Sequence, residues 1–142
     1  MQSIQDVGLA VKRLQWRHHR DSNRRLGSVG LSLVQWDVLR HARRQPDATL
    51  HSLAELTFQT DQSMGELARR MVDRDLLERV DGPGRAVRHR LTPAGERAYA
   101  DGAGIVEDVL SETLGRLTPA EREQLYGLLT KATGNEPGQT SP

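Results

Sequence analysis

Cysteine is absent from the 142 residues, and aromatic side chains are few: one phenylalanine, two tyrosines and two tryptophans. Without cysteine the chain has no disulfide bonds, thiolate zinc sites or thiol redox sensor. No apolar run approaches the roughly 18 residues that a membrane span requires, and the N-terminus lacks the apolar core typical of a signal peptide. We therefore expect a cytoplasmic protein that does not enter the membrane.

Catalytic motifs are also missing. The sequence has no phosphate-binding GKS/T loop, no GxSxG motif and no HExxH motif. The adjacent His18 and His19 would point about 100° apart on a helix, which makes them a poor metal chelate. The sequence therefore predicts neither a cofactor nor a metal site, and we do not expect an enzyme.

The charges are segregated along the chain, although the net charge is only +1. Residues 11–25 hold six bases against one acid, and residues 69–90 hold seven arginines against four acids. Residues 99–142 hold seven acids against three bases. A basic part and an acidic part are expected if one face of the protein meets nucleic acid.

The stretch from residue 49 to residue 92 carries the most specific pattern. A short helix is predicted over 50–56, and after a three-residue connector Thr60 caps a second helix whose apolar residues recur at steps of three and four. Two helices joined by so short a turn match a helix-turn-helix. Two strands, 76–80 and 86–91, flank a turn rich in glycine and proline. The predicted fold is a winged helix-turn-helix, mainly α with a small β-hairpin wing.

The exposed side of the second helix indicates what this unit binds. A helix in a major groove uses its first turns on base edges, while residues on its flanks hold phosphates. An arginine on a thin, glycine-flanked loop can enter a narrow minor groove. The sequence therefore predicts contacts with double-stranded DNA from helix and wing, through Thr60, Gln62, Ser63, Glu66, Arg69, Arg70, Arg85 and Arg88.

An alternative interpretation keeps the fold and changes the partner. The unit would be a protein-interaction module with a weak or covered DNA face, and its arginines would form a solvated surface. The two interpretations differ in whether Gln62, Arg70 and Arg85 converge on one basic face. Ion pairs from Asp61 and Glu66 to those arginines would favour the alternative.

Helices are also predicted on both sides of the winged helix-turn-helix. Residues 4–25 form the first, and residues 93–117 and 118–133 form two more, with a bend or fraying expected near 101–104 because glycines cluster there. Their apolar stripes exceed what one small winged helix can cover. We expect a homodimer, although the same stripes could close the core of a monomer.

Two helix starts carry capping signals. Ser32 with Gln35 and Thr118 with Glu121 each form a capping box, in which two side chains satisfy free N–H groups of the first turn. Pro93 and Pro119 suit the first position of the helices that they open. The predicted organisation is one domain over 1–133, with the winged helix-turn-helix at 31–92, dimerisation helices at 4–25 and 93–133, and a disordered tail at 134–142.

The chain resembles the MarR family of bacterial transcriptional regulators. The resemblance covers roughly residues 4–133 and depends on the segments 31–39, 53–56, 76–79 and above all 84–95, which reads GRAVRHRLTPAG. It implies a homodimeric repressor on a pseudo-palindromic operator, with the recognition helix in the major groove and the wing in the minor groove. It also implies that a small-molecule effector releases the DNA.

Several positions depart from the family pattern. Pro83 stands where many members have an aspartate that orients the wing arginine, and Gly65 and Glu66 stand where threonine and a basic residue are common. Asp75 replaces the usual glycine after the recognition helix, although aspartate tolerates the left-handed conformation. These departures bear on the operator sequence and the affinity more than on the fold.

The residues that would line an effector site are less well marked. Trp16, His19 and Trp36 are candidates for a cleft between the N-terminal helices and the winged helix. Against that stands the interpretation that all three are core or dimer contacts. The sequence identifies no ligand.

Overall fold

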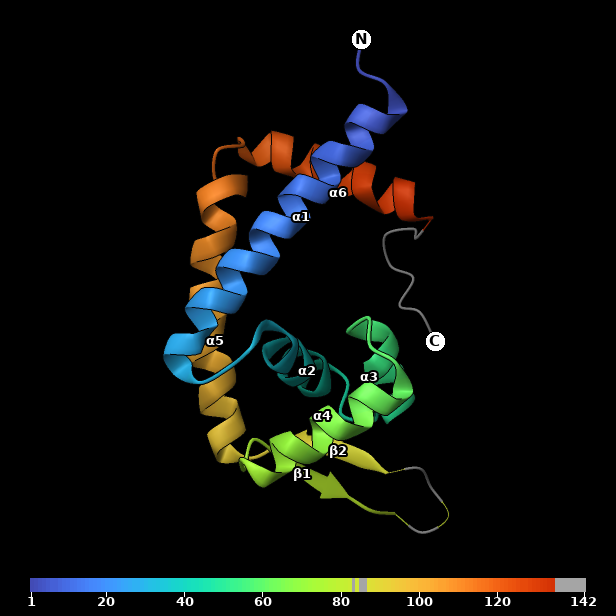
Figure 1. The fold of residues 1–142 in the computed structure, drawn as a ribbon, viewed down its shortest axis with the longest axis vertical. Helices are drawn as coiled ribbons and strands as arrows, with labels where there is room; N and C mark the ends of the chain where they lie inside the picture. The colour runs from blue at the N-terminus through green and yellow to red at the C-terminus, as the bar shows by residue number, and fades with distance from the viewer. Residues whose placement is uncertain (83, 85–86, 135–142) are drawn as a thin grey trace. The chain divides into compact units, whose positions relative to one another are not determined.

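The computed structural model describes residues 1–82, 84 and 87–134. The chain divides into two compact units, residues 1–106 and 107–142. The described part contains helices and a two-stranded antiparallel hairpin, which confirms the predicted fold class (Figure 1). In chain order the elements are α1 (Ile4–Leu26), the 3-10 turn η1 (Gly27–Val29), α2 (Leu33–Arg44), α3 (Leu50–Leu56), α4 (Asp61–Asp73), β1 (Leu77–Val80), β2 (Arg88–Leu91), α5 (Pro93–Leu114) and α6 (Pro119–Thr133).

Helix α1 begins with a capping box that the sequence analysis did not identify. The Ser3 hydroxyl accepts a hydrogen bond from the Asp6 N–H at 3.1 Å, and the Asp6 carboxylate accepts one from the Ser3 N–H at 3.0 Å. The apolar stripe of its first half is uncovered, with Ile4 91% and Val7 55% exposed. The last residue, Leu26, is fully buried, so α1 joins the core only at its end.

Helix α2 begins as predicted at the Ser32–Gln35 capping box. The Ser32 hydroxyl accepts from the Gln35 N–H at 3.2 Å, and Gln35 Oε1 accepts from the Ser32 N–H at 3.0 Å. One face of the helix is buried and supplies a large part of the core, through Trp36, Val38, Leu39 and Ala42.

Helices α3 and α4 form the predicted helix-turn-helix and pack against each other. The turn is closed by the Thr57 hydroxyl, which donates to the Leu53 carbonyl at 2.6 Å, and by the Gln59 N–H, which donates to the Ala54 carbonyl at 2.8 Å. Figure 1 shows α2, α3 and α4 gathered beside the hairpin. The core side chains of the pair are Leu53, Ala54, Met64, Leu67, Ala68 and Met71.

The hairpin follows α4 through a left-handed residue. Asp75 has φ 59°, and the N–H of Leu76 returns to the carbonyl of Met71 at 2.9 Å, which ends the helix as the sequence suggested. In the antiparallel register Leu77 lies opposite Leu91. Both strands are shorter than predicted, since β1 begins after Leu76 and β2 begins at residue 88.

Helix α5 begins close to the hairpin. The Thr92 hydroxyl accepts from the Gly95 N–H at 2.9 Å, and the Thr92 N–H donates to the Leu76 carbonyl at 3.2 Å. A Cβ atom on Gly95 would lie 2.0 Å from the Leu76 carbonyl oxygen. Glycine is therefore required there for the helix to approach the backbone so closely.

Two expectations about α5 were wrong. The helix is continuous through residues 101–104, so it is not frayed there, and it ends at Leu114 rather than at residue 117. Gly102 is explained by packing, because a Cβ atom there would lie 2.4 Å from Cδ1 of Trp36. The glycine makes room for an indole and does not weaken the helix enough to break it.

Helix α6 begins at the predicted Thr118–Glu121 capping box with Pro119 in the first turn, and it ends at Gly134 with φ 80°. Its apolar residues are largely uncovered: Leu125 is half-buried, and Leu128 is 65% exposed. Apart from Gly134, the predicted tail 134–142 lies outside the described residues. No helix in the described part of the chain combines the length and apolar character of a membrane span.

Candidate nucleic-acid interface

The first turn of α4 presents small polar groups to solvent. The Thr60 hydroxyl accepts from the Ser63 N–H at 3.1 Å, which satisfies one free backbone donor and fixes the start of the helix. Gln62 and Ser63 are both exposed. The predicted cap is therefore confirmed, and both side chains can meet an incoming ligand at the positive end of the helix.

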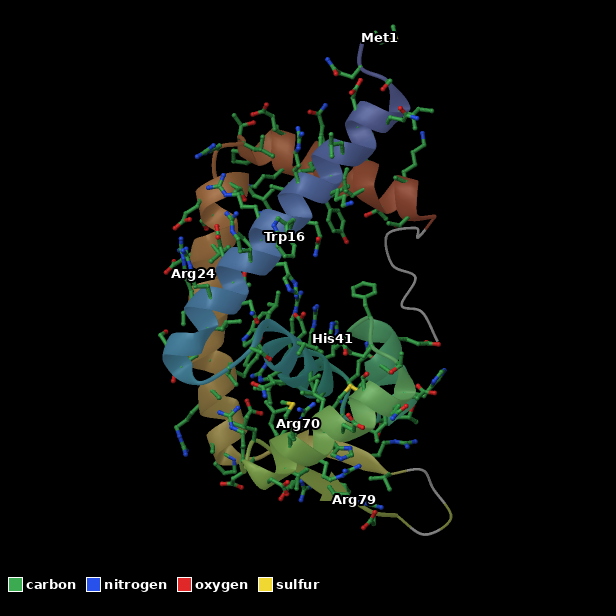
Figure 2. The ribbon with its side chains drawn as sticks, in the orientation of Figure 1. Met1, Trp16, Arg24, His41, Arg70 and Arg79 are labelled. Atoms are coloured by element: carbon green, nitrogen blue, oxygen red, sulfur yellow. The ribbon has the colours of Figure 1, made fainter. Side chains whose placement is uncertain are left out.

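The arginine side chains of α4 are accessible to a binding partner. Arg69 and Arg70 are exposed, and Figure 2 shows Arg70 on the helix. Among the described residues no ion pair joins either arginine to Asp61 or Glu66. Glu66 is exposed on the same helix. The ion pairs that would favour the protein-interaction alternative are therefore not found on the described helix α4.

The carboxylate of Asp61 pairs with a histidine of α3 instead. His51 Nδ1 lies 2.9 Å from Asp61 Oδ1, and its Nε2 lies 3.1 Å from Glu55 Oε1. The hydrogen bond with Asp61, assisted by both negative charges, raises the pKa of His51. Protonated His51 partly offsets two acids beside the start of α4. The sequence analysis missed this contact, although histidine four residues before glutamate on a helix is a recognisable signal.

Phe58 is a second feature that the sequence analysis passed over as part of a connector. It lies in the turn between α3 and α4 with φ 58°, a left-handed conformation that is uncommon for a residue with a bulky side chain. Its side chain is 95% exposed. The only phenylalanine in the sequence therefore stands in solvent next to the start of α4.

Most described charges of the hairpin are paired. Arg79 Nε lies 3.0 Å from Asp81 Oδ1, and Arg90 forms an ion pair with Glu78 on the opposite strand. Figure 2 shows Arg79 on the hairpin. These two arginines offer little net charge to a polyanion.

The two predicted wing contacts differ in what the structure shows. Arg85 lies outside the described residues, so its placement stays a prediction; neighbouring Gly84 has φ 66°, as a tight turn requires. Arg88 opens β2, is half-buried and forms a backbone bridge with Thr49. It lies opposite Val80, in the strand pair next to the turn.

Strand β2 holds a buried histidine. His89 is 6% exposed, and its Nδ1 has no hydrogen-bond partner among the described residues. Burial, and next the charge of Arg79, lower the pKa of His89, while Asp81 opposes the shift. The lowered pKa favours the neutral form of this buried ring.

The three effector candidates belong to two different ring stacks. Trp16 stacks on His19 with ring centroids 5.8 Å apart, and Trp16 is 57% exposed. Trp36 is buried, stacks on Tyr99 and donates from Nε1 to the Tyr99 carbonyl at 3.1 Å. The structure makes Trp36 a core residue, and it leaves Trp16 and His19 accessible.

The sequence profile of the MarR family matches residues 29–86, from the η1 turn into the wing. This match shows that the winged helix-turn-helix part of the chain is similar to the MarR family. Its boundaries enclose α2, α3, α4 and β1, and therefore most of the predicted DNA-binding surface. None of the curated proteins compared with the chain matches its sequence.

Several solved structures of other proteins share the fold over most of this chain. BpsR of Bordetella bronchiseptica, described in connection with regulation of its DNA binding by 6-hydroxynicotinic acid, is 27% identical with a TM-score of 0.78, covering 89% of this chain and 98% of that one. A probable transcriptional regulator from Pseudomonas aeruginosa is 26% identical with a TM-score of 0.73, over 89% and 96%. A mutant MarR from E. coli complexed with operator DNA is 22% identical with a TM-score of 0.78, over 89% and 92%.

Proposed function

We propose that this protein is a homodimeric, sequence-specific repressor of the MarR family that binds a pseudo-palindromic operator and is released by a small molecule. Helix α4 enters the major groove, and the wing with Arg85 enters the adjacent minor groove. Operator binding would place its action in the cytoplasm, as the sequence predicted. The observation that carries the proposal is the exposed face of α4, whose arginines are free of the neighbouring acids.

The chemistry of that face supports DNA as the partner. Exposed Gln62 and Ser63 stand on the first turn, where amide and hydroxyl groups can hydrogen-bond with base edges. Glu66, one turn further, can accept a hydrogen bond from cytosine N4. Arg69 and Arg70 follow and can neutralise phosphates. This order, with polar groups on the first turns and arginines after them, suits a helix that meets DNA, whereas a helix face that only meets water does not require it.

The uncovered apolar side chains support a homodimer. Ile4, Val7 and Val11 are spaced along one stripe of α1, and each is about half or more exposed. On α6, Tyr126 and Leu128 are likewise exposed. Association with a second copy would remove these side chains from water, and a two-fold axis would set two recognition helices about one DNA turn, roughly 34 Å, apart.

The accessible Trp16–His19 stack supports an effector site on α1. A flat aromatic ligand can extend a stack of this kind, and a carboxylate on it would be attracted to the basic second half of the helix. BpsR, with its 6-hydroxynicotinic acid, provides the natural first probe. We propose that Trp16 and His19 contact such a ligand; Trp36 is buried in the core and is not part of the proposed site.

A gel-shift experiment tests the proposal. Purified protein is mixed with the DNA upstream of its own gene, in 50 mM and 200 mM salt, with scrambled duplex as competitor. Specific retention that weakens by several orders of magnitude at the higher salt is expected if several arginines neutralise phosphates. Equal competition by scrambled DNA, or no retention, would overturn operator binding. Adding 6-hydroxynicotinic acid to the retained complex then tests release.

A further inference from the structure

We propose that Arg74 is a positioning residue, which locks the end of the recognition helix to the turn between α1 and α2 and does not contact phosphate. Arg74 follows the last residue of α4, and its N–H still donates to the Arg70 carbonyl at 3.1 Å. Its guanidinium donates to the Gly30 carbonyl at 2.6 Å and to Gln35 Oε1 at 3.3 Å. The inference rests on the proposed DNA binding for its functional consequence.

Both acceptors belong to the junction that orients α1. Gly30 has φ 75° and follows η1, and its N–H donates to the Gly27 carbonyl at 3.1 Å. Gln35 is the third residue of α2, and the same Oε1 atom accepts from the Ser32 N–H. Arg74 therefore supports the cap of α2 while it holds the end of α4.

The junction is tied to α1 by further bonds. The Asn23 side chain on α1 accepts from the Leu33 N–H at 2.9 Å, and the Leu31 N–H donates to the Leu26 carbonyl at 3.1 Å. A change in the direction of α1 must therefore displace the Gly30 carbonyl, which Arg74 holds. In this way Arg74 links α1, which carries the uncovered apolar stripe, to α4, which is proposed to enter the DNA groove.

A phosphate contact is the competing role, since Arg74 is an exposed arginine directly after α4. The geometry favours the lock instead. The guanidinium donates from two of its nitrogens to protein oxygens, one of them the backbone carbonyl of Gly30. A Cβ atom on Gly30 would lie 3.2 Å from the nearer guanidinium nitrogen, so the side chain fits closely against the turn. Arg70, four residues earlier, has no such protein partner among the described residues and provides the matched comparison.

The test measures the affinity of the full-length wild type, Arg74→Met, Arg74→Lys and Arg70→Met for one operator duplex across 50–200 mM salt. Arg74→Met should weaken binding roughly tenfold, because a charge-assisted hydrogen bond is removed, and leave the slope of log K against log salt unchanged. Arg74→Lys keeps the charge and should still bind severalfold more weakly, because an ammonium cannot span both acceptors as the planar guanidinium does. Arg70→Met should reduce the slope by about 0.9 for each phosphate that the protein no longer neutralises.

Hydrogen exchange on the free proteins supplies a readout that does not depend on DNA. Exchange at the amides of Leu31 and Gln35 should speed up in Arg74→Met, while the Gly95 amide, in the cap of α5, keeps its wild-type rate. Arg70→Met should change none of the three.

The possible outcomes distinguish failure of the positioning role of Arg74 from failure of the proposed DNA binding. A smaller salt slope in Arg74→Met with unchanged exchange would make Arg74 a phosphate contact and overturn the proposal. Faster exchange with wild-type affinity would also overturn it, because the lock would then stabilise the turn without positioning α4. If the wild type binds no DNA at all, the proposed function fails, and the exchange data alone decide whether Arg74 holds the turn.

Discussion

The indole ring of Trp36 on α2 lies directly against Gly102 on α5, so closely that a Cβ atom on the glycine would lie 2.4 Å from the indole Cδ1. The same indole stacks on Tyr99 at a centroid distance of 5.8 Å, with 7° between the planes. One turn nearer the start of α5, Arg43 and Glu96 form an ion pair at 2.9 Å. Together these contacts fix the first half of α5 against α2.

Substitution of Gly102 tests this packing. Gly102→Ala should destabilise the fold by about 1–3 kcal/mol, because the new methyl group overlaps the indole ring. Gly104→Ala is the matched control, since nothing lies within 4 Å of a Cβ atom there, and it should be neutral or stabilising by up to about 1 kcal/mol. Urea unfolding followed by circular dichroism measures both. Equal effects of the two substitutions would contradict the close contact.

The wing arginine provides a test of DNA contact. Arg85→Ala should weaken operator binding by about 1–3 kcal/mol and leave the fold and the dimer intact. Arg79→Ala is the control on the same hairpin; its guanidinium is already paired with Asp81, so a smaller loss is expected. Fluorescence anisotropy with a labelled operator measures the affinities. Unchanged affinity in Arg85→Ala would remove the wing from the proposed interface.

The apolar stripe of α1 predicts how the dimer can be broken. Val7→Asp places a charge on the stripe and should shift the protein toward monomer in sedimentation velocity, with a parallel loss of operator affinity. Gln5→Asp adds the same side chain on the opposite side of the helix and should leave the dimer unchanged. A Val7→Asp protein that sediments like the wild type would place the dimer contact elsewhere.

The buried histidine of strand β2 predicts a pH dependence. The pKa of folded His89 lies below its ordinary value of 6.5, so below about pH 6.5 the unfolded chain takes up a proton that the folded protein excludes. Stability should therefore fall as the pH drops from about 6.5 toward the pKa of the folded state. Burial lowers the pKa of His18 and His41 as well, so His89→Gln should reduce this slope without removing it. Thermal unfolding between pH 5 and 7 measures the slope, and an unchanged slope in the variant would exclude His89 as a contributor.

Features that depend on residues close together in the chain could be predicted from the sequence. The capping boxes at Ser32 and Thr118 and the left-handed Asp75 all depend on residues within a few positions of one another, and the structure confirms each. The helix-turn-helix followed by a hairpin could be predicted for the same reason, because it is a sequence of short local patterns.

Contacts between distant residues could not be predicted in this way. Gly102 seemed to weaken α5 because its partner, Trp36, lies far earlier in the chain and no local pattern joins them. The hydrogen bond from Arg74 to the Gly30 carbonyl could not be predicted either, because a backbone carbonyl carries no sequence signal. Helical periodicity tells which residues face outward, but it does not tell which of those find a protein partner.

Hydroxyl-radical footprinting on the retained upstream fragment tests dimeric operator binding, because it shows where along the duplex the protein lies. The account predicts two protected segments related by an inverted repeat, with centres about 10 base pairs apart or a multiple of that, since two recognition helices of one dimer enter successive major grooves. Protection that is uniform along the fragment, or a single segment without a repeat, would contradict a dimeric operator-binding protein.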